Sequence, residues 1–279
     1  MQQVYINING KLIVSADAAV AHDNRAFRYG YGLFETILYR DGKIAMKEYH
    51  TDRLFAGVRQ LGFGMPALMN EAWFEEEIQR TVKKNKLEKL CRVRLQLYPG
   101  RGGLYDVQNT KPEYIIECFP LDEYIIGLND SGLTLGIAQG LNKSMDSLAN
   151  LKSCNALIYA IAAQQAKANK WNDALIVNTD DNIIESTIAN VFWIKNSVVF
   201  TPALSEGCVA GTMRRRLLNE LPGMGYEISE AVLEENTLMQ ADEVFLTNAI
   251  KSIKWVSAIN NKIYKRQIVN DIYNKLFGS

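Results

Sequence analysis

The stretch Ile183-Ile184-Glu185-Ser186-Thr187-Ile188-Ala189-Asn190-Val191-Phe192 predicts a strand, a small polar turn and a second strand. Glu185 ends the first apolar run. A carboxylate between two apolar runs needs a partner, because an unpaired buried charge is costly. A protonated ring nitrogen of a cofactor would be such a partner, and the alternative is a glutamate exposed at the end of an ordinary hairpin.

Helices and strands flank this hairpin without a regular βα alternation, which argues against a Rossmann sheet or an eightfold barrel and favours an α+β fold. Asn9-Gly10 and Asp41-Gly42 are typical of two-residue hairpin turns. The pattern becomes polar and irregular within Pro120–Ser131, so we expect one domain at 1–120 and another at 121–279. Strands are predicted at 4–8, 12–14, 34–39, 43–46, 92–98, 114–119, 133–139, 174–178, 190–194, 198–200, 226–229 and 243–247, and helices at 49–60, 71–85, 155–169, 212–221 and 266–277.

The composition excludes several classes of protein. The chain has 279 residues, 31 Lys+Arg and 31 Asp+Glu, and zero net charge argues against an obligate nucleic-acid binder because phosphate neutralisation needs a cationic surplus. No stretch approaches the roughly 20 apolar residues of a membrane span. The start, Met1–Tyr5, lacks the basic region and apolar block of a signal peptide. We therefore expect a cytoplasmic protein with a small-molecule substrate and neither a nucleic-acid nor a membrane partner.

Histidine is scarce, since His22 and His50 are the whole supply, and the four cysteines are scattered singly. Neither C-x-x-C nor H-E-x-x-H occurs, so no metal site is expected. The base of an enzyme with this composition is expected to be a lysine. Lys152 precedes an apolar helix start, and an amine in a partly desolvated site loses its proton easily and can form a Schiff base with an aldehyde cofactor. The alternative is a surface lysine near a helix N-terminus.

Two segments have the residue types that bind an anion. Small residues at 207–211 precede a helix, where backbone N–H groups and the helix dipole favour a phosphate; a flexible helix start is the alternative. Arg53, on the predicted helix 49–60, offers a fork that suits a phosphate or a surface carboxylate. The run Arg214-Arg215-Arg216 is expected to form a solvated helix face. The glycines at 30–32 and 100–103 are no dinucleotide fingerprint, because neither set lies between the strand and helix of a βαβ unit.

Read together and in order, these segments resemble the class IV aminotransferase family of pyridoxal-phosphate enzymes, which includes branched-chain and D-amino-acid aminotransferases and aminodeoxychorismate lyase. The resemblance extends over roughly Tyr29 to Val256. It implies a fold-type IV enzyme, with a smaller N-terminal and a larger C-terminal domain, the cofactor between them, and a homodimer. The motifs are H-x-x-R-L at Arg53, L-K-S-x-N at Lys152, E-x-x-x-x-N-x-F at Glu185 and G-T-M-R at Gly211, with further matches at Tyr29–Thr36 and Ala241–Phe245.

The resemblance also implies residue roles. Lys152 would hold the cofactor as a Schiff base and, once released, act as the base that moves the substrate Cα proton. Glu185 would bind the pyridine nitrogen and keep it protonated. The phosphate would be held by Arg53 and the backbone N–H groups of Thr212 and Met213.

A second phosphate-side turn of the family matches Asn248-Ala249, although a Thr or Ser is often found where Ala249 stands. Substrate contacts are expected from Tyr29, Phe34, Arg101 and Tyr105.

The family's reactions differ, and the residues favour the lyase, which releases pyruvate and 4-aminobenzoate in folate precursor synthesis. Lyase-like segments are Gly211–Arg214, Arg101–Tyr105 and Leu246–Ala249. The loop lacks the second arginine often found just before the tyrosine in the lyase, which leaves Arg101 as the nearest carboxylate anchor. Leu151–Ser153 and Asn190–Phe192 look more like D-amino-acid aminotransferases. An aminotransferase acting on branched-chain or D-amino acids is therefore the alternative.

Overall fold

The computed structural model describes residues 3–106 and 108–278, and the chain forms two compact units. The first unit extends to Ile125 and also includes Leu151–Ala156. The second comprises Ile126–Asn150 and the described residues from Leu157 onward. The chain therefore leaves the first unit, returns to it for six residues that include Lys152, and leaves it again.

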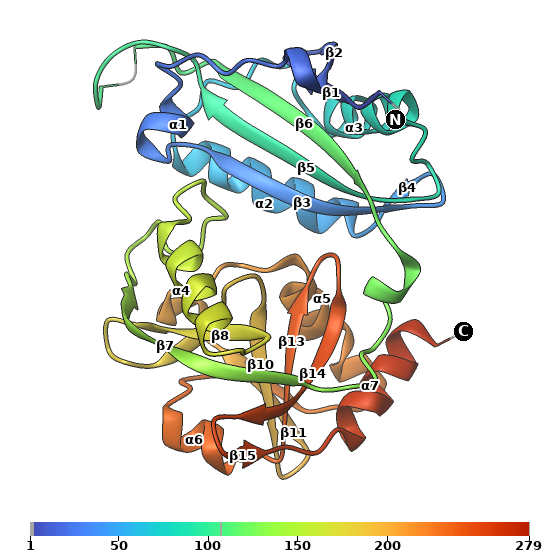
Figure 1. Ribbon diagram of the computed structural model, residues 1–279, viewed down its shortest axis with the longest axis vertical. Coiled ribbons are helices and arrows are strands. Elements are labelled where there is room, and N and C mark those ends of the chain that lie inside the picture. Colours follow the sequence, from blue (N-terminus) through green and yellow to red (C-terminus); the bar gives the residue numbers. More distant parts are fainter. Residues whose placement is uncertain (1–2, 107, 279) are drawn as a thin grey trace. The chain divides into compact units, whose positions relative to one another are not determined.

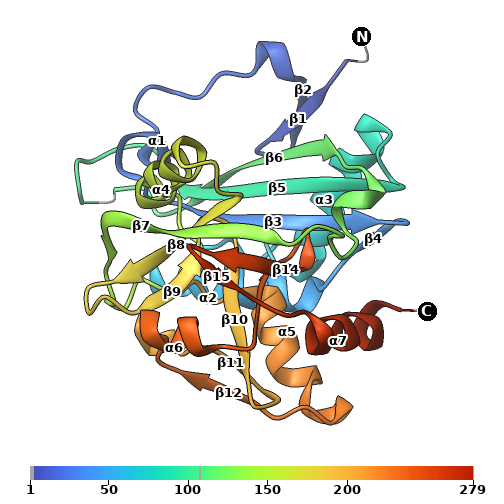
Figure 2. The same ribbon diagram turned by 60° about the horizontal axis from the view of Figure 1, so that its bottom comes forward.

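The first unit is built on a six-stranded antiparallel sheet with the strand order β2-β1-β6-β5-β3-β4 (Figure 1). Both predicted hairpin turns are confirmed, with positive φ at Asn9, Gly10, Asp41 and Gly42. Figure 2 shows β6, β5 and β3 side by side as the long central strands. The strands are β1 (Tyr5–Ile8), β2 (Lys11–Val14), β3 (Leu33–Arg40), β4 (Lys43–Ile44), β5 (Leu90–Pro99) and β6 (Pro112–Pro120).

Two helices, α2 (Lys47–Gln60) and α3 (Glu71–Asn85), cover one face of this sheet. Asn70 caps α3 because its side-chain oxygen accepts hydrogen bonds from the backbone N–H groups of Ala72 and Trp73, which lack helical partners. The buried core between helices and sheet is Leu33, Ile37, Leu54, Val58, Phe74, Ile78, Val82, Val93, Leu95, Leu97 and Ile116 with their neighbours.

The strand register assigns side chains to the two faces of the sheet. Phe34 is paired with Gln96, and Thr36 with Arg94. Directly paired residues share a face, and successive residues alternate between faces. Phe34 and Arg94 therefore lie on the face opposite α2 and α3, whereas Glu35, next to Phe34, points toward α2.

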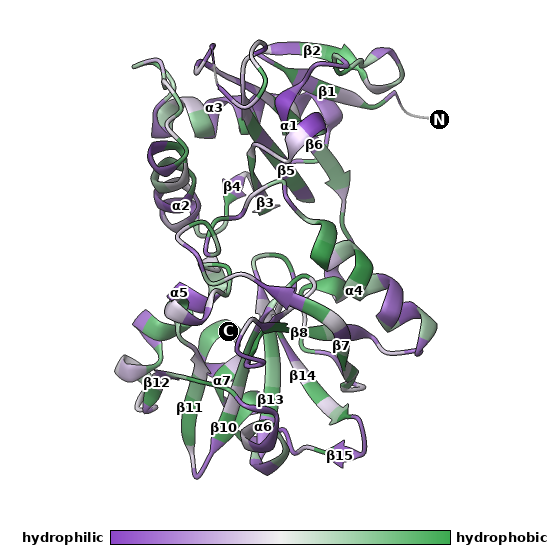
Figure 3. Cartoon of the chain, turned by 90° about the vertical axis from the view of Figure 1, so that its left-hand side faces the viewer, coloured by the Kyte–Doolittle hydropathy of each residue, from purple (hydrophilic) through white to green (hydrophobic). Residues whose placement is uncertain are grey.

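The second unit is built on a nine-stranded mixed sheet with the order β12-β11-β10-β13-β14-β7-β8-β9, in which β15 pairs with β14 and β9 also pairs with β10. The strands β10 and β13 are apolar in the middle and almost entirely buried (Figure 3). The bounds are β7 (Leu133–Lys143), β8 (Asp173–Asn178), β9 (Ile183–Ser186), β10 (Asn190–Lys195), β11 (Val198–Pro202), β12 (Ile228–Ala231), β13 (Glu243–Asn248), β14 (Ser252–Ile259) and β15 (Lys262–Ile263), with helices α4 (Leu157–Ala168), α5 (Thr212–Glu220), α6 (Glu235–Gln240) and α7 (Gln267–Phe277).

Two parts of the sequence interpretation need correction. The run 214–216 is not a solvated face, because Arg214 is buried, pairs with Glu230 and donates a hydrogen bond to the carbonyl of Pro202 at 2.8 Å. The strand β14 was not predicted, because Lys254 interrupts its apolar pattern. That lysine is buried, and its amine donates to the carbonyl of Gly127.

The described residues contain neither a candidate membrane span nor a candidate metal site. No helix there has the length and hydropathy needed to cross a membrane. The same residues contain no group of three or more His, Cys, Asp or Glu side chains arranged to hold a metal ion.

Candidate functional site

Lys152 is positioned by β3, in the first unit. Its carbonyl accepts a hydrogen bond from the backbone N–H of Phe34 at 2.9 Å, and the N–H of Cys154 donates to the carbonyl of Gly32 at 2.8 Å. Ser153 forms an isolated antiparallel bridge with Leu33. The amine of Lys152 lies 4.5 Å from the centroid of the Phe34 ring. The lysine is half-buried, and the aromatic face of Phe34 restricts where its amine can lie.

Arg94 approaches the same ring and was missed by the sequence analysis. Its guanidinium carbon lies 4.0 Å from the Phe34 centroid, and it donates a hydrogen bond to the side chain of Gln96 at 3.2 Å. Among residues 3–106 and 108–278, no carboxylate lies within ion-pair distance of this guanidinium. Burial lowers the pKa of Arg94, an effect opposed by Cys154 and Glu117. The alternation Arg92, Arg94, Gln96 in the sequence was the available signal for a polar sheet face.

Arg53 is held in a fixed orientation by Glu35. The nitrogens Nε and Nη2 of Arg53 donate to the two carboxylate oxygens at 2.8 and 2.5 Å. The Nδ1 of His50 lies 2.6 Å from Oε2 of the same carboxylate, and both Glu35 and His50 are almost fully buried. Burial alone would raise the pKa of Glu35, but Arg53 and His50 outweigh it and lower that pKa to about 2. A bidentate pair of this kind fixes a guanidinium plane.

The expected substrate contacts form two groups in the first unit. Phe34 lies beside the amine of Lys152. The rings of Tyr29 and Tyr105 lie 5.4 Å apart, at the end of α1 (Arg25–Tyr29) and on the loop after β5. Arg101 is on that loop, largely exposed, with Nε 3.6 Å from Asp23.

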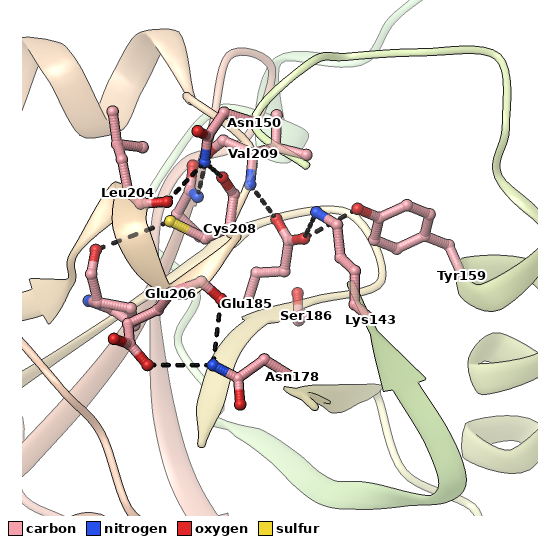
Figure 4. A network of polar contacts seen from close by, with 12 residues as sticks. Lys143, Asn150, Tyr159, Asn178, Glu185, Ser186, Leu204, Glu206, Cys208 and Val209 are labelled. Carbon is pink, nitrogen blue, oxygen red and sulfur yellow. Dashed lines mark hydrogen bonds and ion pairs between the residues drawn. The ribbon is translucent and has the colours of Figure 1, made fainter. Parts of the chain in front are cut away.

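Glu185 lies in the second unit, on β9 beside β10, and is buried (Figure 4). Its Oε1 accepts hydrogen bonds from the amine of Lys143 at 2.6 Å and the hydroxyl of Tyr159 at 2.8 Å. Its Oε2 accepts from the backbone N–H of Val209 at 2.9 Å. Burial, followed by the Glu185 charge, raises the pKa of Tyr159, so the tyrosine stays a donor. The alternative of an exposed hairpin glutamate is therefore wrong.

The Glu185 carboxylate retains room for one more donor. A carboxylate offers about four acceptor sites, and the described residues occupy three of them. On the neighbouring strands, Asn190 pairs with both Glu185 and Thr247. The Thr247 hydroxyl is buried and has no hydrogen-bond partner among the described residues. Unsatisfied buried polar groups are rare in native proteins, so a ligand that brings polar atoms fits this region.

The N-terminus of α5 adds an anion-binding feature to the second unit. No described side chain caps it, and its first turn contains no acidic residue. Gly211 precedes Thr212 and Met213, and a Cβ at Gly211 would lie 1.9 Å from the Asn190 side-chain oxygen. Only glycine permits this approach. The free N–H groups of a first helical turn attract anions.

Asn248 ends β13, and Ala249 follows it in a tight turn of the second unit. The side-chain oxygen of Asn248 accepts hydrogen bonds from the backbone N–H groups of Ile250 and Lys251 at 3.0 and 2.7 Å. Its side-chain amide donates to the carbonyl of Ile188 at 3.3 Å. Asn248 therefore fixes the path of this turn, and Ala249 contributes no side-chain hydrogen bond.

These groups fit the chemistry of pyridoxal phosphate. The first unit supplies an amine on an aromatic face, Lys152, and an oriented guanidinium, Arg53. The second supplies a buried carboxylate with spare acceptor capacity, Glu185, and an uncapped helix start at Thr212. The groups of the first unit suit an aldehyde and a phosphate, and those of the second suit a protonated ring nitrogen and a phosphate.

Comparisons with known proteins agree with this chemistry. The sequence pattern of the family described as Amino-transferase class IV matches residues 32–259. Aminodeoxychorismate lyase of Vibrio harveyi is 29% identical over 86% of this chain and 88% of its own. A putative branched-chain-amino-acid aminotransferase of Methanocaldococcus jannaschii is 27% identical over 97% and 93%. The crystal structure of a putative 4-amino-4-deoxychorismate lyase from Legionella pneumophila superimposes with a TM-score of 0.84 at 27% identity, covering 94% of this chain and 96% of that one. The α+β, fold-type IV prediction is thereby confirmed.

Proposed function

The chain belongs to the class IV aminotransferase family, and on that premise we propose that it binds pyridoxal phosphate and acts as an aminodeoxychorismate lyase. The substrate would be 4-amino-4-deoxychorismate and the products pyruvate and 4-aminobenzoate. The similarity to aminodeoxychorismate lyase of Vibrio harveyi and the lyase-like loop Arg101–Tyr105 support this choice.

The cofactor roles follow from the contacts described above. Lys152 would hold the cofactor aldehyde, and Glu185, held by Lys143 and Tyr159, would accept a hydrogen bond from the protonated ring nitrogen. Arg53 and the N–H groups at the start of α5 would bind phosphate oxygens. When bound, pyridoxal phosphate supplies an electron sink for negative charge at the substrate Cα. The amine of Lys143, the hydroxyl of Tyr159 and the backbone N–H of Val209 all donate to the Glu185 carboxylate and hold it in one orientation.

Lys152 also moves the proton. With the cofactor and substrate bound, its amine would be the base that takes the proton from the substrate Cα. The Phe34 ring beneath the amine restricts its path, and the backbone pairing with β3 keeps Lys152 in place after it is released. Neither histidine is required for this role.

The observation that carries the choice of lyase is the glycine loop after β5. Gly102 and Gly103 both have positive φ, and a Cβ at Gly103 would lie 1.9 Å from the carbonyl of Asp106. The two glycines are therefore required by the path of the loop, and this path carries Arg101 and Tyr105. Arg94, with no carboxylate partner among the described residues, adds a cation that suits a substrate bearing carboxylates.

An aminotransferase acting on branched-chain or D-amino acids is the second candidate. The Leu151-Lys152-Ser153 motif favours it, as does the similarity to the putative branched-chain-amino-acid aminotransferase of Methanocaldococcus jannaschii. Such an enzyme would use the same Lys152 and Glu185, but would return the Cα proton to the cofactor.

One product assay separates the two candidates. The purified protein, loaded with pyridoxal phosphate, is incubated with aminodeoxychorismate and, separately, with a panel of L- and D-amino acids. We expect pyruvate and 4-aminobenzoate in equal amounts from the first incubation. A protein that carries cofactor but forms neither product, and that is converted to the pyridoxamine form by an amino acid, is an aminotransferase.

We also propose that the protein is a homodimer, as the family resemblance implies. Light scattering of the loaded protein measures its mass, and we expect twice the mass of one chain. The cytoplasmic location stays a prediction.

A further inference from the structure

Arg25 is a buried cation with an unusual set of partners. It is 2% exposed and lies at the start of α1. Its Nη1 donates to the carbonyls of Gly102 at 2.8 Å and Gly103 at 3.3 Å, and its Nη2 donates to the carbonyl of Tyr105 at 3.1 Å. In the part of the chain that the structure describes, no carboxylate lies within ion-pair distance of it. Burying a charge without a counter-ion is costly, so the carbonyl groups replace both water and counter-ion.

Aromatic rings complete the surroundings of this guanidinium. Its central carbon lies 5.3 Å from the ring centroid of Tyr29 and 5.6 Å from that of Tyr31. The Tyr29 ring in turn contacts Tyr105. Tyr105 is therefore attached to the fold twice, through its carbonyl to Arg25 and through its ring to Tyr29.

The loop has few other attachments. The hydrogen bond from the N–H of Gly100 to the carbonyl of Lys111 fixes its base, and the N–H of Leu104 bonds within the loop to Asp106. Arg101 also pairs with Asp23, its Nε 3.6 Å from the carboxylate, but among the described residues the hydrogen bonds that join residues 101–105 to the rest of the fold all come from Arg25. Leu104 and Tyr105 are 69% and 85% exposed, so little burial holds them.

We propose that Arg25 is a positioning residue for substrate binding: it holds the Gly102–Tyr105 segment, and with it Arg101 and Tyr105, in the conformation that receives an anionic substrate. This inference rests on the proposed function for the identity of the substrate. The hydrogen bonds of Arg25 go to the loop and its ring contacts to Tyr29 and Tyr31, so we expect its loss to leave cofactor attachment and proton transfer in place and to weaken substrate binding. Its planar fork matters as well as its charge, because three carbonyls are held by two nitrogens.

The test compares Arg25→Gln and Arg25→Lys with Arg28→Gln in the cofactor-loaded protein. Arg28 lies on the same helix and is exposed, and its hydrogen bonds within the described part of the chain go to His22. We expect all variants to keep the cofactor absorbance. Arg25→Gln should raise KM about tenfold or more with kcat within about twofold of wild type, as expected for lost charge-assisted hydrogen bonds. Arg25→Lys, which keeps the charge but not the fork, should be intermediate, and Arg28→Gln should match wild type.

A second measurement does not depend on the substrate. Trypsin cleaves after Arg101, and cleavage at an exposed loop follows the population of its open form. We expect Arg25→Gln to be cut there at least about tenfold faster than wild type, with the cut located by mass spectrometry. Unchanged cleavage in both Arg25 variants would overturn the proposal. A fall in kcat at constant KM would also overturn it.

If no lyase activity is found but cleavage accelerates, the proposed substrate is wrong and the role of Arg25 in holding the loop stands. If Arg25→Gln does not fold, Arg25→Lys alone decides by the same criteria.

Discussion

Lys152 and Phe34 are joined both through the backbone and through their side chains. The carbonyl of Lys152 accepts the Phe34 N–H at 2.9 Å, and the lysine amine lies 4.5 Å from the centroid of the Phe34 ring. The backbone bond fixes where the lysine begins, and the ring limits where its amine can go. A side-chain substitution at 152 therefore leaves the backbone pairing intact.

Lys152→Ala should remove cofactor attachment without unfolding the protein. We expect loss of the cofactor absorbance, and a fall in activity of at least about 100-fold, the scale of a missing general base. The free energy of unfolding, measured with urea, should change little. Lys152→Arg is the matched control, since it keeps a cation on the Phe34 ring but cannot attach the aldehyde. Cofactor that stays bound to Lys152→Ala after borohydride reduction would mean that another lysine is used.

Acid should destabilise the first unit in two stages. Burial lowers the pKa of His50 below its ordinary 6.5, although Glu35 opposes the shift. Stability from a neutral buried histidine is therefore full above pH 6.5 and is lost as the pH falls below it. The pKa of Glu35 is lowered from 4.5 to about 2, so its contribution is lost between those values. The first stage is measured by urea unfolding at a series of pH values from 8 to 5, in steps of ~0.5 pH unit, which gives the free energy of unfolding at each pH.

His50→Asn isolates the histidine contribution. Its amide keeps a donor toward Glu35 but does not titrate. We expect its free energy of unfolding to be less dependent on pH between about 6.5 and 5 than that of wild type. Parallel curves for the two proteins in that range would show that His50 is not the titrating group.

Lys143→Met should weaken the second unit. The amine is 2.6 Å from Glu185, and both side chains are largely buried. Removing one partner of a buried ion pair leaves an uncompensated charge and costs about 3 kcal/mol or more. Urea unfolding of the cofactor-free protein should show this loss, and cofactor binding measured by titration should weaken. Lys143→Arg keeps the charge and should therefore recover most of the stability and most of the cofactor affinity. If the Lys143→Met and Lys143→Arg variants are equally stable, the role of Lys143 is not ionic.

Arg94→Gln should raise KM for a carboxylate substrate about tenfold, the scale of one charge-assisted hydrogen bond, with little effect on kcat. The reason is the absence of a carboxylate partner for this guanidinium among the described residues. Steady-state kinetics measure both constants. Arg92→Gln is the control from the same strand, because Arg92 is exposed and contacts Phe119. An equal rise in KM for both variants would indicate a general effect of charge.

Local chemistry made much of the fold predictable. The Asn9-Gly10 and Asp41-Gly42 turns, and the helix Glu71–Asn85 with its apolar periodicity, were found where predicted. The short helices were not predicted: α1 has five residues and α6 has six. Their stability comes from tertiary contacts rather than from their own sequence.

Some residues of the candidate site could likewise be predicted from local sequence, and others could not. Lys152, Glu185 and Arg53 stand in recognisable motifs, but their partners do not. Lys143 is 42 residues from Glu185 in the chain, and nothing near either residue indicates the pairing. Arg94 lies in a strand whose polar alternation indicates a surface equally well. Contacts between distant segments depend on the register of the sheet, and no local pattern specifies that register.

The return of residues 151–156 to the first unit affects how this enzyme can be divided. A chain cut after Ile125 keeps all six strands of the first sheet but loses Lys152, and it also loses Leu151, which lies beside Gly57 of α2. During synthesis the first unit cannot be completed until Ala156 has left the ribosome. A single recombination crossover between homologues cannot exchange either unit intact, because each is made of two separated stretches. The lysine is therefore transferred with the first sheet only when both of its stretches are transferred together.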